Sequence, residues 1–204
     1  MKPIKSLLVL AIVLAPALAS AQGYYYRGSP DPLPGGFHNR VGHLTYGFGL
    51  ELGGMHDGGS AITSCDNCDV KPLALELDGH IGGVLTPRFA LMLELQGNFQ
   101  TIHSNRFDGD TTLSQGAAML AGQFWILPQL WIKGGIGFAS LQVDDTYVTQ
   151  DFGTGGALMG AIGVELFSAR RFALELQGRL IEGTYNSLDD NVTSGTIGVG
   201  INWY

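Results

Sequence analysis

The sequence predicts an all-β protein, an eight-stranded antiparallel up-and-down transmembrane β-barrel, and three observations support this fold class. Eight stretches alternate between apolar residues and small or polar residues, and the apolar set of each carries no charge. A period of two places the two sets on opposite faces of a β-strand. The stretches are about as long as a membrane-crossing strand requires, roughly 9–11 residues. Their polar face is rich in Gly and Ala, whereas Lys, Glu and Thr would be typical of a solvated sheet.

Glycine is unusually frequent, at 31 of 204 residues, about twice its usual share of about 7%. Because glycine weakens isolated strands, such a number indicates a close approach of backbones or a crowded interior.

The chain begins with a segment typical of an exported protein. Residues 1–5 include two lysines, residues 6–19 are apolar with one proline, and Ala19-Ser20-Ala21 offers the small residues that signal peptidase needs. We therefore predict a signal peptide at 1–21, a flexible N-terminal tail at 22–40 and the barrel at 41–204. Removing the signal peptide leaves nine of the eleven basic residues against 18 acidic ones, a balance that argues against nucleic-acid binding.

The first four strands are expected at 41–54, 71–85, 88–102 and 115–127. Turn residues such as Pro87 and Pro128, or long polar stretches, separate them. Their alternating apolar residues should face outward: Leu44, Tyr46, Phe48, Leu50 and Leu52; Leu73, Leu75, Leu77 and Ile81; Phe89, Leu91, Leu93, Leu95 and Phe99; Leu120, Phe124 and Ile126.

The last four strands are expected at 130–142, 155–167, 172–185 and 195–204. The same alternation selects their outward side chains: Ile132, Ile136 and Phe138; Leu158, Ile162, Val164 and Leu166; Phe172, Leu174, Leu176 and Leu180; Ile197, Val199, Ile201 and Trp203.

The connections and an internal repeat support the count of eight. Long acidic loops follow the first, third, fifth and seventh strands, and short turns follow the second, fourth and sixth, as in bacterial outer-membrane barrels. The stretch from Arg88 to Gly97 also resembles the stretch from Arg171 to Gly178, since both contain Arg-Phe-Ala-Leu and Glu-Leu-Gln-Gly. Both copies follow a short turn and should enter the membrane from the same side.

Residues 41–204 resemble the small eight-stranded outer-membrane β-barrel family, which includes the OmpA transmembrane domain and OmpX-type proteins. The closing stretch, Gly198 to Tyr204, is similar to the C-terminal signal that the barrel-assembly machinery reads, which makes Ile201, Trp203 and Tyr204 the expected assembly signal. In this chain the outward register ends on the penultimate Trp203, whereas the family usually places an aromatic in register at the very end. The resemblance implies a location in the bacterial outer membrane, with outer-membrane lipid, lipopolysaccharide and the assembly machinery as partners, and a monomer.

The inward faces of the expected strands carry charged residues. Burying carboxylates without partners is costly, so these groups should pair within the lumen. An interior salt-bridge network that plugs the lumen is the main expectation. A narrow cation-selective path is the alternative, because six acids face only two bases: Glu51, Glu76, Asp78, Glu94, Glu165 and Glu175 against Lys133 and Arg179.

Two further motifs lie in or beside the expected loops. Cys65 and Cys68 should form a disulfide in an oxidising compartment, with a metal site that includes His56, Asp57 and Asp69 as the weaker alternative. His103-Ser104 is the one adjacent His–Ser pair, but the expected outward faces hold no acid to complete a hydrolase site. We predict no catalytic, cofactor or metal site.

The expected function is therefore a structural or surface-interaction role for a barrel with a largely plugged lumen. Three alternatives stay open: a narrow channel for small hydrophobic or ionic solutes, as in OmpW-type barrels; an outer-membrane lipid hydrolase; and a soluble periplasmic barrel of lipocalin type, with its apolar residues inward.

Overall fold

The structure, a computed structural model of the chain, describes residues 31–57, 60–61, 73–104, 109–144, 149–186 and 191–204. The expected signal peptide and the pair Cys65 and Cys68 lie outside these residues. No helix within the described ranges is long and apolar enough to cross a membrane.

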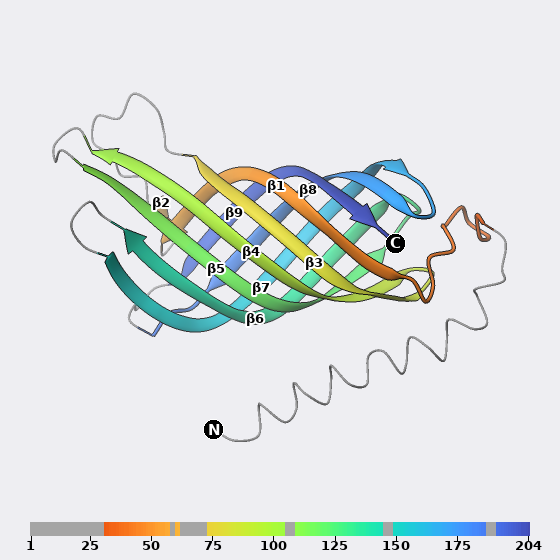
Figure 1. The fold of residues 1–204 in the computed structure, drawn as a ribbon, viewed down its shortest axis with the longest axis horizontal. Helices are drawn as coiled ribbons and strands as arrows, with labels where there is room; N and C mark the ends of the chain where they lie inside the picture. Colours follow the sequence, from red (N-terminus) through yellow and green to blue (C-terminus); the bar gives the residue numbers. More distant parts are fainter. Residues whose placement is uncertain (1–30, 58–59, 62–72, 105–108, 145–148, 187–190) are drawn as a thin grey trace, which may run out of the picture.

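The described residues form one closed antiparallel sheet (Figure 1). Each long strand pairs with the next along the chain, and β1 pairs with β9 from Tyr46↔Trp203 to Asp57↔Val192, which closes the barrel. The two-residue β2 pairs only with His56 and Asp57 at the end of β1, so the wall has eight strands and the predicted fold class is confirmed. The strands are β1 (Leu44–Asp57), β2 (Ser60–Ala61), β3 (Ala74–Thr86), β4 (Phe89–Ser104), β5 (Gly109–Trp125), β6 (Leu130–Asp144), β7 (Thr149–Ser168), β8 (Phe172–Gly183) and β9 (Val192–Trp203).

The barrel is apolar outside, and its interior holds buried charged and polar side chains together with apolar ones such as Met92 and Ile181. Phe48, Leu95 and Ile136 are 61%, 64% and 65% exposed, whereas Glu51 and Glu94 are fully buried. The alternation predicted from the sequence is therefore confirmed. Its apolar residues face outward, as a lipid environment requires. The lipocalin-type alternative is wrong, because it needs the apolar set inside.

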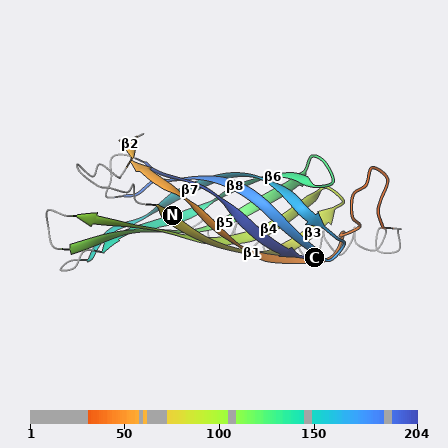
Figure 2. The same ribbon diagram turned by 90° about the horizontal axis from the view of Figure 1, so that it is seen from above.

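The two ends of the barrel differ (Figures 1 and 2). At one end, here called the turn end, short turns join β3 to β4, β5 to β6 and β7 to β8, β1 begins and β9 ends. At the other, the loop end, β5 begins at Gly109 and β7 at Thr149, six residues before the expected starts at 115 and 155. Those expectations were wrong because the strands continue as hydrogen-bonded ladders beyond the end of the apolar alternation in the sequence.

Residues 31–43 form a folded segment at the turn end, which we call the N-terminal cap. Leu33, Phe37 and Val41 are buried, and Gly42 N–H donates to Val84 O at 2.8 Å. In place of the flexible tail that the sequence suggested, the described part of 22–40 packs on the barrel. Its apolar side chains stand four residues apart, and Gly35 and Gly36 between them and Gly42 after them have positive φ, so no strand period reveals the packing.

Candidate functional site

The centre of the lumen is organised by Arg179 on β8. Its Nη1 lies 2.5 Å from Glu94 Oε1 and its Nη2 lies 3.0 Å from Asp78 Oδ1. Its Nε lies 3.4 Å from Glu76 Oε1 and 3.6 Å from Glu51 Oε1. These carboxylates come from β1, β3 and β4, three consecutive strands of the sheet, so one guanidinium links all three to β8.

Neighbouring polar groups complete this central network. Lys133 Nζ lies 3.1 Å from Glu94 Oε2. Gln177 Nε2 donates to Glu51 Oε1 at 2.7 Å and to Asp78 Oδ2 at 3.3 Å. We use the name central network for Glu51, Glu76, Asp78, Glu94, Lys133, Gln177, Arg179 and Thr196.

Thr196 joins two of these carboxylates. Its Oγ1 lies 2.6 Å from Glu51 Oε2 and 2.7 Å from Glu76 Oε2. Glu51 and Glu76 are also direct neighbours across the β1–β3 ladder. A hydroxyl has a single proton to donate, so Thr196 serves one carboxylate at a time. The network thus holds four carboxylates and two cationic side chains.

Inward-facing glycines give the network its space. A Cβ on Gly49 would lie 2.6 Å from Gln177 Nε2, and a Cβ on Gly163 would lie 2.8 Å from Trp131 Cη2. Such contacts are shorter than real Cβ atoms make. The crowded interior therefore accounts for part of the glycine excess.

Glu175 lies in a second group held by neutral donors. Trp131 Nε1 donates to Glu175 Oε2 and Asn202 Nδ2 donates to Glu175 Oε1, both at 2.7 Å. Asn202 Oδ1 in turn lies 2.5 Å from His80 Nε2. The Trp131 ring also lies 5.2 Å from Lys133 Nζ, which places this group beside the central network.

Glu165 lies in a third group, which we call the mouth cluster: Arg40, Trp125, Glu165, Ser168 and Tyr204. Arg40 of the cap binds the Glu165 carboxylate through two parallel hydrogen bonds, Nη1 to Oε1 at 2.8 Å and Nη2 to Oε2 at 2.9 Å. Arg40 Nη2 also donates to Ser168 Oγ at 3.2 Å and to Ala169 O at 2.7 Å. The guanidinium lies 3.7 Å from the centre of the Tyr204 ring.

The surroundings of Arg40 keep it charged. Burial works against the charged form, but the hydrogen bonds and negative charge of Glu165 outweigh burial and hold the pKa of Arg40 above its ordinary value. The cap is therefore attached to the barrel by a buried, bidentate ion pair, the strongest geometry available to such a pair.

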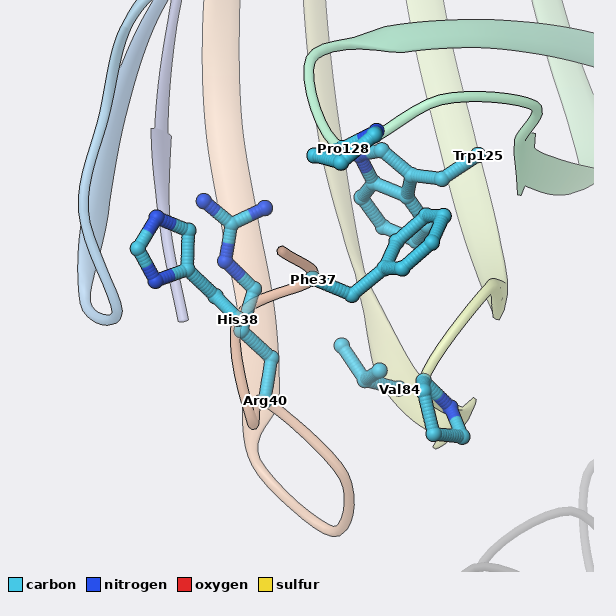
Figure 3. Close-up of a pocket in the computed structure, with 7 residues that line it drawn as sticks. Phe37, His38, Arg40, Val84, Trp125 and Pro128 are labelled. Carbon is cyan, nitrogen blue, oxygen red and sulfur yellow. The ribbon is translucent and has the colours of Figure 1, made fainter. Parts of the chain in front are cut away.

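The cap and the turns close the turn end. Figure 3 shows Phe37, Arg40 and Trp125 around a small cavity that Val84, Pro87, Pro128 and His38 also line. The cavity has about 10 Å³ of space, room for about one water molecule and far below what a ligand needs. Arg88 lies over the Phe37 ring at 4.3 Å and covers it from outside.

Neutral polar groups, together with apolar side chains such as Met55 and Ile181, fill the lumen towards the loop end. Gln115 Nε2 donates to Tyr185 Oη at 2.6 Å, and Asn98 Nδ2 donates to Ser194 Oγ at 3.1 Å. Tyr185 was expected to continue the seventh strand, but β8 ends at Gly183 and the Tyr185 side chain is buried. Side chains therefore occupy the described lumen along its length.

The structure places the eight predicted lumen residues inside the barrel, but in three groups. Six belong to the central network, whereas Glu165 and Glu175 lie in separate groups. Sequence reasoning missed Arg40 and the inward Tyr204. The available signal was the surplus of inward acids, six against two inward bases, which leaves room for a base from outside the strands.

The C-terminal residues point to opposite sides of the wall. Trp203 lies in an outer aromatic cluster, 5.5 Å from Tyr46 and 5.8 Å from Phe172 between ring centres. Ile201 shares this outward register, whereas Tyr204 is buried in the mouth cluster. The outward register therefore ends at the penultimate Trp203, as the sequence indicated, because the last residue, Tyr204, packs inside the barrel.

The remaining candidate sites receive no support. The side chains of His103 and Ser104, like Cys65 and Cys68, lie outside what the structure describes. Within the described ranges no group of three or more His, Cys, Asp or Glu side chains is arranged to hold a metal ion.

Comparison with known proteins identifies the fold. No protein-family model and no curated protein matches the sequence. Among solved structures, Ail, the attachment invasion locus protein of Yersinia pestis, is similar with a TM-score of 0.51 and 11% identity, over 78% of this chain and 97% of Ail. Neisserial surface protein A is similar with a TM-score of 0.52 and 13% identity, over 78% of this chain and 95% of that protein.

The fold is that of the small eight-stranded membrane barrels. The resemblance noted in the sequence is confirmed at the level of fold.

Proposed function

We propose that this protein is an integral outer-membrane β-barrel with a closed lumen and a structural or surface-interaction role. The observation that carries the proposal is the belt of exposed large apolar side chains around a buried ionic interior. Moving a leucine or phenylalanine side chain from water into an apolar medium is worth about 1.5–3 kcal/mol. Lipid supplies that medium for the whole belt, and a closed barrel leaves no strand edge unpaired within it.

Orientation follows from the two ends. Outer-membrane barrels have short periplasmic turns and longer outer loops. The turn end, with the cap and the C-terminus, then faces the periplasm, and the loop end faces outward. In this orientation Tyr46, Phe172 and Trp203 form part of the aromatic girdle near the periplasmic interface.

A closed lumen is supported by the contacts of Arg179. An eight-stranded barrel is just wide enough for its own side chains, and the Arg179 side chain contacts carboxylates of β1, β3 and β4. The cap then covers the periplasmic mouth. This arrangement supports a structural or surface role over transport.

The partners we propose are outer-membrane lipid, lipopolysaccharide and the barrel-assembly machinery, with the chain as a monomer and without enzymatic activity. Ail was crystallised with a heparin analogue, a highly sulfated anion. Between the strand segments, the sequence instead carries acidic residues: Asp66, Asp69, Asp108, Asp145, Asp189 and Asp190. Divalent cations that bridge such carboxylates to lipopolysaccharide phosphates are therefore a better chemical match than a sulfated anion. Trp203 provides the outward aromatic of the proposed assembly signal.

Planar-bilayer conductance of the refolded protein tests the closed lumen. We expect no steady unit currents. The four carboxylates against two cations in the central network favour a narrow cation path as the second candidate. Steady cation currents that Glu94→Gln abolishes would establish that path and overturn the closed lumen.

Detergent dependence tests membrane insertion itself. The purified protein should need detergent for solubility and should migrate differently on gels before and after heating. The same preparation should not hydrolyse lipid A, and turnover that His103→Ala removes would favour the hydrolase instead.

A further inference from the structure

We propose that the barrel wall at the turn end contains a guanidinium-binding site, whose resident ligand is Arg40 of the N-terminal cap. The site would take the same group from an arginine side chain of another chain when Arg40 is absent. The mouth cluster supports this inference in three ways.

First, the wall prepares the carboxylate without help from the cap. Trp125 Nε1 donates to Glu165 Oε1 at 2.8 Å, Tyr204 Oη donates to the same oxygen at 3.3 Å, and Ser168 Oγ donates to Oε2. These donors belong to β5, to β7 and to the residue after β9. Glu165 therefore keeps three hydrogen bonds if Arg40 leaves.

Second, the geometry selects a planar guanidinium. Two parallel hydrogen bonds to one carboxylate need the fixed fork of the guanidinium group, which an ammonium lacks. The carbonyl of Ala169 and the hydroxyl of Ser168 accept from Arg40 Nη2, and the Tyr204 ring lies against the face of the group. A flat cation satisfies the carboxylate, the carbonyl and the aromatic face together.

Third, the ligand and the site belong to separable parts of the molecule. Arg40 lies in the cap, outside the strands, whereas Glu165 lies 125 positions later in β7. Arg179 differs in this respect, because β8 carries it and its removal disrupts the wall network itself. Tethering to the barrel gives Arg40 a high effective concentration at the site, so a free guanidinium competes only when Arg40 is substituted.

Chemical rescue of full-length Arg40→Ala tests the proposal. The refolded variant is titrated in detergent with millimolar methylguanidinium, with methylammonium as the matched cation, and the unfolding midpoint and tryptophan fluorescence are recorded. We expect a lower midpoint for the variant and a saturable recovery with methylguanidinium. The apparent affinity of the variant for methylammonium should be lower than that for methylguanidinium by about tenfold or more.

Two further titrations distinguish a guanidinium supplied by another molecule from the one supplied by Arg40. Free L-arginine should act as methylguanidinium does on Arg40→Ala, which establishes that the site accepts arginine in trans. The unsubstituted protein should show no saturable response to either compound, because Arg40 occupies the site.

Glu165→Gln in the Arg40→Ala background is the matched control and should abolish the recovery. Equal responses to the two cations, a recovery that survives Glu165→Gln, or no saturable response at all would each overturn the proposal. Should Arg40→Ala fail to refold, Arg40→Met takes its place, because it keeps an apolar stem of similar length and leaves the guanidinium position without a cation, and the same criteria apply.

Discussion

Two buried arginines hold this molecule in different ways. Arg179 belongs to the wall and lies among four carboxylates of three strands, whereas Arg40 arrives from the N-terminal cap and binds one carboxylate with ideal bidentate geometry. Around Arg179 the acids outnumber the bases, and around Arg40 one acid meets one base. We infer that Arg179 is required for the barrel to exist and Arg40 only for its mouth to be closed.

Arg179→Met should have the largest effect and gives the first test of this difference. The substitution leaves Lys133 as the one cation of the central network, facing four carboxylates. Breaking one buried ion pair costs about 3–5 kcal/mol, so we expect the free energy of unfolding to fall by about 5 kcal/mol or more. Urea unfolding in lipid vesicles, followed by heat-modifiable migration, measures the loss.

Arg179→Lys is its matched control. It keeps the charge without the fork of donors, and its stability should lie between those of Arg179→Met and the unsubstituted protein. A loss of about 1 kcal/mol or less for Arg179→Met would show that the central network is not what holds the wall together.

Arg40→Ala should have a smaller effect that is confined to the turn end. Glu165 keeps the hydrogen bonds of Trp125, Ser168 and Tyr204, so we expect a loss of about 2–3 kcal/mol. The barrel should stay folded while protease begins to cleave within the cap, which limited proteolysis and mass spectrometry can detect. Arg88→Ala, which removes only the contact over Phe37, should leave the cap mostly protected. If Arg40→Ala unfolded the barrel together with the cap, the inference that Arg40 serves only to close the mouth would be wrong.

Much of the wall could be predicted from the sequence, but the partners of each charge could not. The alternation determines which face of the wall a residue occupies, because charged side chains are excluded from the lipid-facing positions along the whole length of each strand. Which carboxylate meets Arg179 depends on the stagger of the closed barrel, which no local pattern encodes. Arg40 was missed for a related reason, since it lies in an aperiodic segment and its partner is 125 positions away.

Gly163→Ala probes the wall between the two arginine sites. The new methyl group would meet the ring of Trp131, whose indole donates to Glu175 beside the central network. Overpacking of this kind costs about 1–3 kcal/mol. Gly160→Ala is the matched control, because a Cβ there meets nothing within 4 Å and should change stability by about 0.5 kcal/mol or less. Equal effects of the two substitutions would mean that the interior is less crowded than the glycines indicate.

The smallest effect should be a pH dependence that is confined to the cap. Burial works against the charged form of Asp31, but the backbone N–H of Asn39, at 2.9 Å, and the side chain of His38 favour it and hold the pKa of Asp31 below its ordinary value of 3.8. A carboxyl whose pKa is lowered on folding adds stability above its unfolded pKa and loses it as the pH falls through the folded pKa. Protection of the cap from an acid-active protease should therefore decrease as the pH falls below about 3.8, while the barrel stays heat-modifiable. Asp31→Asn should remove this dependence, and an unchanged pH profile in that variant would assign the cap's acid response to another group.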